Sequence, residues 1–189
     1  DLSTEDLIAE EEMVVTVSHA GYVKRNPVSL YRAQRRGGRG RTGAATRDED
    51  FLESLFVAST HSYLLVFSDK GKVYWLKVHE IPQAGRSARG KPIVNLVHTA
   101  PGEKVAAILP VRRLPEPSGG AAEAPEAEVE ERGEGAEGEQ FVFMATRRGL
   151  IKKTRLDQFA RPRPAGIIAL GIEDGDELIA ARLTDGKSH

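Results

Sequence analysis

A repeated hairpin pattern constrains this chain more than any other feature of its 189 residues. An apolar run, a short connection ending in glycine and a second run that turns basic occur three times, around Gly21, Gly71 and Gly149. β-Branched and aromatic residues on both sides of a glycine that can take positive φ are typical of a β-hairpin. Each connection opens with Ser or Thr, whose hydroxyl can hydrogen-bond the turn backbone. The pattern predicts three repeated β units.

The spacing of the glycines defines the repeat length and locates one insertion. Gly21 and Gly71 are 50 residues apart, whereas Gly71 and Gly149 are 78 apart. The excess of 28 nearly equals the 27 residues of segment 114–140, so we interpret that segment as an insertion. Each unit also ends in a further apolar run, at residues 51–58, 105–111 and 178–183.

These units predict an all-β fold in which blades of about four short antiparallel strands surround an axis, as in propellers. We expect an acidic lead-in at 1–13 and blades at 14–63, 64–113 and 141–189. The alternative is one β-sandwich that contains three hairpins, in which case the equal spacings are coincidence.

The insertion at 114–140 has an unusual composition. It holds nine Glu and five Gly but one Arg, one β-branched residue (Val129) and no aromatic residue. Such a segment cannot bury enough apolar surface to offset its ordering entropy, so we expect it to be disordered. It could be a plain solvated loop, a mimic of DNA that occupies a basic surface, or a device that repels like-charged partners.

The net charge of −1 hides two opposed parts. Residues 1–12 and 114–140 together carry −14, so the other 150 residues carry +13. The most basic piece, residues 14–47, has eight Lys or Arg and no acid. Such a concentration indicates a polyanionic partner, nucleic acid first and an acidic membrane surface second.

Other classes of function find little support. The chain has no cysteine, and its five histidines do not stand at metal-ligand spacing, so no metal or cofactor is expected. Gly186–Ser188 imitates the end of a P-loop, but Ala181 stands where that motif requires glycine. No apolar run approaches the length of a membrane span, and no signal peptide is apparent, so a cytoplasmic protein is expected.

The basic segment contains one concentrated motif, Gln34-Arg35-Arg36-Gly37-Gly38-Arg39-Gly40, which Arg41 follows. Guanidinium groups supply bidentate donors for phosphate oxygens, and glycine lets the backbone approach a polyanion closely. The motif could be a disordered RNA-binding segment, a localisation signal or an ordered phosphate-binding loop. Its position between two strand-like runs of one unit favours the ordered loop.

The motif resembles, without a mismatch, the seven-residue box of the C-terminal domain of the bacterial DNA gyrase A subunit. Residues 18–25, 67–74 and 89–96 also look like that domain, and the resemblance covers essentially the whole chain except the acidic insertion. It implies a β-pinwheel, a propeller-like ring of usually five or six blades in which neighbouring blades exchange strands. With three units visible, we expect an incomplete ring.

The resemblance also implies a function. The family's domain wraps duplex DNA around a basic rim, and this promotes negative supercoiling by a type II topoisomerase. It assigns DNA wrapping to Arg35, Arg36, Arg39 and Arg41, with Gly37, Gly38 and Gly40 shaping the loop after Gln34. Charge and repeat position add further rim candidates: Lys24, Arg25, Lys70, Lys72, Arg86, Arg89, Lys91, Arg147, Arg148, Lys152 and Lys153.

The resemblance has limits and rivals. The third unit has Arg161-Pro162-Arg163-Pro164-Ala165-Gly166 where the box would lie, so the box is not repeated. The catalytic tyrosine and ATPase regions lie elsewhere in the enzyme, with its ATP and Mg²⁺, so this chain is expected to be non-catalytic. Expected partners are double-stranded DNA and, within the gyrase holoenzyme, the B subunit together with the rest of the A subunit. Open strand edges could also allow self-association. The rivals are the topoisomerase IV A-subunit domain and a propeller that binds an acidic protein.

Overall fold

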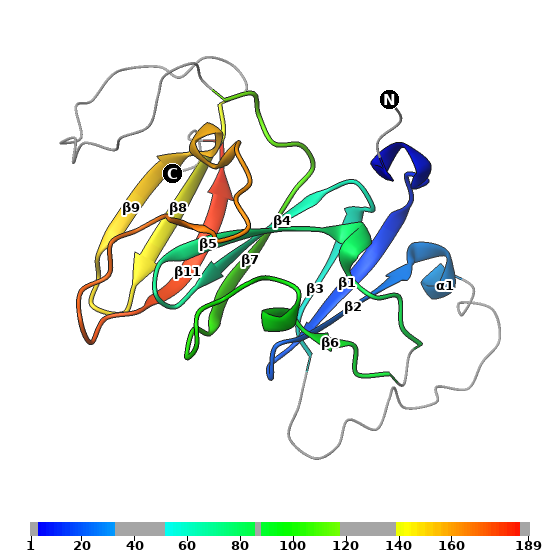
Figure 1. The fold of residues 1–189 in the computed structure, drawn as a ribbon, viewed down its shortest axis with the longest axis horizontal. Coiled ribbons are helices and arrows are strands. Elements are labelled where there is room, and N and C mark those ends of the chain that lie inside the picture. Colours follow the sequence, from blue (N-terminus) through cyan, green and yellow to red (C-terminus); the bar gives the residue numbers. More distant parts are fainter. Residues whose placement is uncertain (1–3, 33–51, 86–87, 118–138, 186–189) are drawn as a thin grey trace.

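Three antiparallel sheets form the molecule and lie side by side in chain order (Figure 1). The computed structural model describes residues 4–32, 52–85, 88–117 and 139–185. We call the sheets blades 1, 2 and 3. The all-β prediction is confirmed, because the helical segments within the described ranges are only three to five residues long.

Blade 1 has the strand order β3-β1-β2-β6, and blade 2 has the order β10-β5-β4-β7. Blade 3 has the order β11-β8-β9 within the described residues. The strands of blade 1 are β1 (Glu12–Ser18), β2 (Tyr22–Pro27), β3 (Leu52–Ser59) and β6 (Lys91–Pro92). Those of blade 2 are β4 (Tyr63–Ser68), β5 (Lys72–Lys77), β7 (Val105–Val111) and β10 (Ile167–Ile168). Those of blade 3 are β8 (Phe141–Thr146), β9 (Ile151–Arg155) and β11 (Leu178–Thr184).

Neighbouring blades exchange strands, as the resemblance implied. β6 follows the blade 2 hairpin in sequence but pairs with β2 of blade 1, where Val23 faces Lys91. β10 follows the blade 3 hairpin but pairs with β5 of blade 2, where Val73 faces Ile167. A blade is therefore not one 50-residue unit, because its fourth strand comes from the next unit.

Two apolar cores hold the three blades together. The first joins blades 1 and 2, with Val15 and Val23 packed against the side of blade 2 that carries Leu64 and Tyr74. The second joins blades 2 and 3 and includes Leu65, Phe67, Met144 and Phe159. β4 is buried on both faces because it lies in the middle blade. β8 instead alternates between buried and accessible residues, as expected for a sheet with one packed face.

Short helical turns follow the hairpins at equivalent places. α1 (Val28–Arg32) follows β2, η2 (Val78–Glu80) follows β5, and η4 (Leu156–Phe159) follows β9. The remaining turns are η1 (Thr4–Leu7) before β1 and η3 (Ile93–Asn95) after β6.

The described part of the acidic lead-in is docked on the turn before blade 2. The Thr60 hydroxyl donates to the Ala9 carbonyl at 2.8 Å and accepts from the Glu11 amide at 3.1 Å. A ring nitrogen of His61 lies 2.7 Å from the Ile8 carbonyl oxygen. Glu5 forms an ion pair with Lys77 on β5, and this hydrogen bond lowers the pKa of the Glu5 carboxyl. Residues 4–11 thus connect the edge of blade 1 to blade 2.

Candidate nucleic-acid interface

The three hairpin turns share one hydrogen-bond arrangement. The amides of Gly21, Gly71 and Gly149 donate to the carbonyl three residues earlier at 2.9, 3.1 and 3.0 Å. Their φ angles are 83°, 80° and 90°. In each turn the opening hydroxyl accepts from an amide four residues later, at 3.2, 3.3 and 3.1 Å. The role predicted for Ser and Thr is confirmed, and the turns can be compared position by position.

Basic residues gather on one edge of the blades. In sheet order, β2, β5 and β9 and the exchanged strands occupy one side of each blade, and β3, β7 and β11 occupy the other. We call the first side the outer edge. β7 carries no charged residue, β3 carries only Glu53 and β11 carries only Arg182, whereas β2, β5 and β9 all carry lysine. The hairpin turns and the exchanged strand β6 bring further basic residues to the outer edge, whereas β10 consists of two isoleucines.

In blade 1 the two predicted rim residues on β2 already make protein contacts. The Lys24 ammonium donates to the carbonyls of Ala88 at 2.9 Å and Gly85 at 3.3 Å. Burial lowers the pKa of Lys24. Arg25 donates through Nε to the Ile81 carbonyl at 2.6 Å. Burial lowers the pKa of Arg25, although the charge of Glu11 opposes this. Arg25 therefore links blade 1 to the segment after η2.

The segment around the exchanged strand β6 presents two more accessible bases. The Arg89 guanidinium stacks 3.9 Å above the centre of the Tyr22 ring. Lys91 is exposed on β6. Gly90 lies between them with φ of 89°, and a Cβ there would lie 2.3 Å from the Val23 carbonyl oxygen. A glycine is thus required where this basic segment meets β2.

Blades 2 and 3 repeat the basic edge with different contacts. Lys70 is exposed in the hairpin turn of blade 2, and the Lys72 ammonium lies 5.7 Å from the centre of the Tyr74 ring. In blade 3, Arg147 pairs with Glu177. Arg148 is exposed in the same turn as Arg147. Lys152 donates to the Ala169 carbonyl at 3.4 Å, beside the exchanged strand β10.

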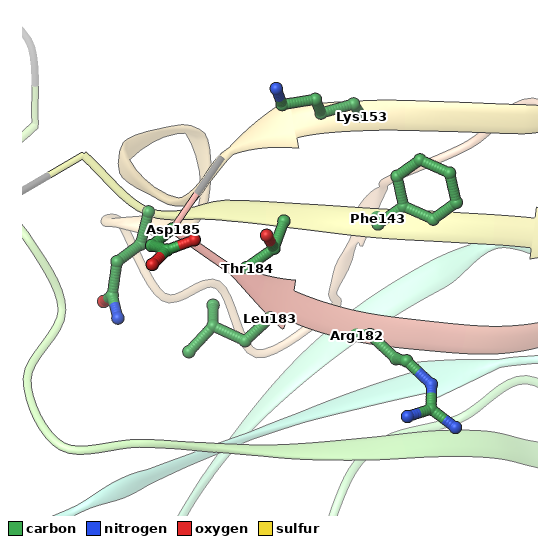
Figure 2. A pocket seen from close by; sticks show the side chains of 7 residues that line it. Phe143, Lys153, Arg182, Leu183, Thr184 and Asp185 are labelled. Atoms are coloured by element: carbon green, nitrogen blue, oxygen red, sulfur yellow. The ribbon is translucent and has the colours of Figure 1, made fainter. Parts of the chain in front are cut away.

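Lys153 is also on β9, but its side chain lies over the face of blade 3 that carries Phe143. Its ammonium is 4.3 Å from the centre of the Phe141 ring. Figure 2 shows it on β9, with Phe143 on β8 between it and Arg182 on β11. These side chains line a shallow hollow of about 590 Å³, together with Leu183 and Asp185.

The strongest sequence prediction lies outside the described residues. The box Gln34–Gly40 and Arg41 fall in 33–51, and Arg86 falls in 86–87. Most of the acidic insertion, residues 118–138, is also outside the described ranges. The roles given to these residues, and the disorder of the insertion, remain predictions.

Sequence reasoning missed some accessible bases and the docked lead-in. Arg112 and Arg113 are exposed directly after β7, where the basic end of an apolar strand was the only available signal. Arg161 and Arg163 are exposed before Gly166, as Arg89 is before Gly90, so the repeat could have located them. The acidic composition of 1–12 gave no sign of the contacts made by Thr60 and His61.

The part of the chain that the structure describes contains neither a cluster of metal ligands nor a helix that could span a membrane. No group of three His, Cys, Asp or Glu side chains is arranged to hold a metal ion there. The helices in those same ranges are all too short or too polar to cross a bilayer.

The fold and its strand exchange define an all-β pinwheel whose blades carry a basic edge. The family model described as DNA gyrase C-terminal domain, beta-propeller, matches residues 12–59, 62–112 and 140–185. The chain belongs to this family.

Relatives and solved structures agree with the family assignment. The DNA gyrase A subunit of Pseudomonas aeruginosa is 48% identical over 207 residues, which cover 98% of this chain and 22% of that protein. The corresponding protein of Escherichia coli is 46% identical over 187 residues, covering 99% of this chain and 19% of that protein. The chain thus spans about a fifth of the length of these relatives.

Among solved structures, the C-terminal domain of DNA topoisomerase IV superposes with a TM-score of 0.69 at 25% identity. That match covers 95% of this chain and 47% of the other. The DNA gyrase A C-terminal domain gives a TM-score of 0.60 at 21% identity, covering 92% and 48%. At 21% identity, this second match supports the fold alone.

Proposed function

We propose that this chain binds duplex DNA along the outer edge of its blades and bends it. Within a DNA gyrase, such bending would present a DNA segment to the B subunit, together with the rest of the A subunit, and so promote negative supercoiling. The observation that carries the proposal is the recurrence of accessible Lys and Arg on the same edge of all three blades. Membership of the gyrase family supports it.

The geometry suits DNA bending better than base recognition. Duplex DNA has a persistence length of about 150 bp, so bending a short site sharply costs on the order of several kcal/mol. Contacts spread along successive blades can offset that cost while they touch mainly phosphates. Lys70, Lys91, Arg89 and Lys152 are exposed and would supply such contacts, and the box Gln34–Gly40 would add the densest group.

In this role the chain would be one part of a larger enzyme. The chain supplies DNA binding, whereas strand cleavage, ATP hydrolysis and Mg²⁺ binding would belong to other parts of the protein. Such a role would be carried out in the bacterial cytoplasm, next to the chromosome.

A fluorescence-transfer assay on an end-labelled duplex, titrated at several salt concentrations, tests binding and bending together. Eight released counterions would give a slope of log affinity against log salt near −7, from roughly 0.9 per phosphate. We expect the combined change Lys70→Ala, Lys91→Ala and Lys152→Ala to make the slope shallower by roughly 0.9 per lysine. Replacing Arg35, Arg36 and Arg39 by Ala should abolish the transfer signal while the circular dichroism spectrum is unchanged.

Arg182→Ala is the matched control, because Arg182 is an exposed base on β11, away from the outer edge. If Arg182→Ala makes the salt slope shallower by as much per residue as the lysine changes do, the proposal is contradicted. Bending that survives the box substitutions would contradict it too. A shallow salt slope would favour an acidic protein partner, and displacement of duplex by single strands would favour RNA.

A further inference from the structure

Residues 4–11, which we call the strap, are held against blade 2 by contacts of two kinds. In the turn between β3 and β4, the Thr60 hydroxyl donates to the Ala9 carbonyl at 2.8 Å. The other contact is the ion pair between Glu5 in η1 and Lys77 at the end of β5. The side chains of Lys77 and Glu5 are 22% and 33% exposed. Partly exposed ion pairs are weak and are screened by salt, so another anion can compete for Lys77.

Lys77 stands on the basic outer edge of blade 2. β10 pairs with β5 only at Lys72 and Val73, so the exchanged strand does not reach Lys77. Lys72 was a rim candidate from the sequence, whereas Lys77 was not. Burial lowers the pKa of the Lys77 ammonium, but the hydrogen bond to Glu5 and the contact with Tyr63 outweigh burial, so that the pKa is raised. Lys77 is therefore a full cation at neutral pH, and Glu5 balances its charge.

The same position of the repeat is paired with an acid in blade 3. The sixth residue after the turn glycine is Lys77 in blade 2 and Arg155 in blade 3. Arg155 pairs with Glu139 at 2.6 Å and with Asp157 at 2.9 Å. Glu139 belongs to the acidic insertion, just as Glu5 belongs to the acidic lead-in. Both acid-rich segments therefore place a carboxylate on the base at this position and neutralise it.

We propose that Lys77 is a further DNA contact of the outer edge and that the strap withholds it, so that DNA and Glu5 compete for one ammonium. This inference rests on the proposed function, in which duplex DNA follows the outer edge. Duplex DNA carries one negative charge per about 1.7 Å of its axis, whereas Glu5 offers a single carboxylate. DNA bound beside Lys72 therefore draws Lys77 away from Glu5 and loosens the strap. By linkage, the strap weakens DNA binding by the same factor.

A double-mutant cycle on the 189-residue chain tests this competition, with duplex affinity measured by fluorescence anisotropy at low salt. Glu5→Gln should raise the affinity about fivefold, the factor expected for a partly exposed ion pair. Lys77→Met should change it little, because Glu5 already neutralises Lys77 in the unchanged chain. In the double variant the gain should be absent, because no ammonium is left to release.

Thr60→Val tests the strap without changing any charge. It removes the hydroxyl that donates to the Ala9 carbonyl, so it should also raise the duplex affinity. Hydrogen exchange measures the reciprocal effect. Saturating duplex should lower the protection of the Ile8 amide, which donates to the Glu5 carbonyl at 3.0 Å. In Lys77→Met, the duplex should leave that protection unchanged.

Glu12→Gln is the matched control, because it removes an exposed acid next to the strap, at the start of β1. An equal gain with Glu12→Gln would overturn the proposal, since net charge alone would then explain the effect. So would a Glu5→Gln variant that binds no better than the unchanged chain, or one whose gain persists in the Lys77→Met background. Either result leaves the proposed function standing, whereas an unchanged chain that does not bind duplex would overturn both. Thermal unfolding checks that each variant is folded, and Lys77→Gln replaces Lys77→Met if that variant is not.

Discussion

Basic residues that look alike in the sequence differ in what they contact. Arg25 and Lys24 are neighbours on β2, yet Arg25 joins blade 1 to blade 2 and Lys24 anchors the segment before β6. Lys70 in the next blade is exposed. A guanidinium that already donates to buried carbonyls would lose those bonds on binding phosphate, so its charge contributes less to a DNA surface. Exposure therefore separates the candidate DNA contacts from the structural bases.

Tyr74 allows a test of a buried polar contact at the scale of single residues. Its hydroxyl donates to Glu103 Oε2 at 2.5 Å, and both side chains are buried. Burial, followed by the hydrogen bond and the charge of Glu103, raises the pKa of Tyr74 to about 12. We expect Tyr74→Phe to lower the free energy of unfolding by about 2 kcal/mol at pH 7, the usual cost of losing a hydrogen bond to a charged group.

The pH dependence of that loss has a definite sign. Because the folded pKa is above the unfolded value of about 10, the contribution of Tyr74 is fully present below pH 10 and declines as the pH rises toward 12. Urea unfolding of both proteins at pH 7 and pH 11 should show the difference shrinking. Tyr22→Phe is the control, since it keeps the ring under Arg89. A pH-independent difference would contradict the assignment.

At the scale of elements, the exchanged strands depend on the glycine before each of them. A Cβ on Gly90 would lie 2.3 Å from the Val23 carbonyl oxygen, and one on Gly166 would lie 2.7 Å from the Tyr74 ring. Both contacts are with the blade that receives the strand. Glycine is thus needed at these positions for two reasons. Its φ is positive, and a neighbouring backbone or ring approaches too closely for a side chain.

Gly90→Ala and Gly166→Ala should therefore detach β6 and β10. Gly21→Ala is the matched control, because Gly21 also has positive φ but a Cβ there has no neighbour within 4 Å. We expect Gly21→Ala to lower the free energy of unfolding by about 1 kcal/mol from backbone strain alone. The two exchanged-strand variants should lower it clearly more. Hydrogen exchange should show loss of amide protection in β6 or β10. An equal loss of unfolding free energy in all three variants would indicate that only the positive φ of each glycine matters.

For the whole molecule, the sequence predicted the hairpins and their number because a turn glycine and flanking apolar runs are local requirements. The source of each fourth strand did not follow from any local pattern. β6 has only two residues, Lys91 and Pro92, and proline is tolerated there because the strand lies at a sheet edge. The docking of residues 4–11 also escaped prediction, since it depends on Thr60 and His61 some 50 residues away. Long-range contacts, in contrast to turns, leave little trace in a single sequence.

The acidic insertion bears on the charge of the whole molecule. Residues 118–138 hold seven Glu and one Arg, a net charge of −6, next to a body that is strongly basic. If these charges compete with DNA for the outer edge, replacing the segment by a short Gly-Ser linker should raise duplex affinity at low salt. The gain should vanish at high salt, where such attraction is screened. Glu139 should be kept, because it pairs with Arg155 at 2.6 Å.

A variant with the same seven Glu changed to Gln is the matched control, because it keeps the length of the segment and removes its charge. Competition by charge predicts the same gain in affinity for the Gln variant and the deletion, measured by fluorescence anisotropy across a salt series. A gain with the deletion alone would instead indicate that the segment blocks DNA by its bulk. No gain with either variant would make the insertion a solvated loop, and the basic edge would then act without competition from it.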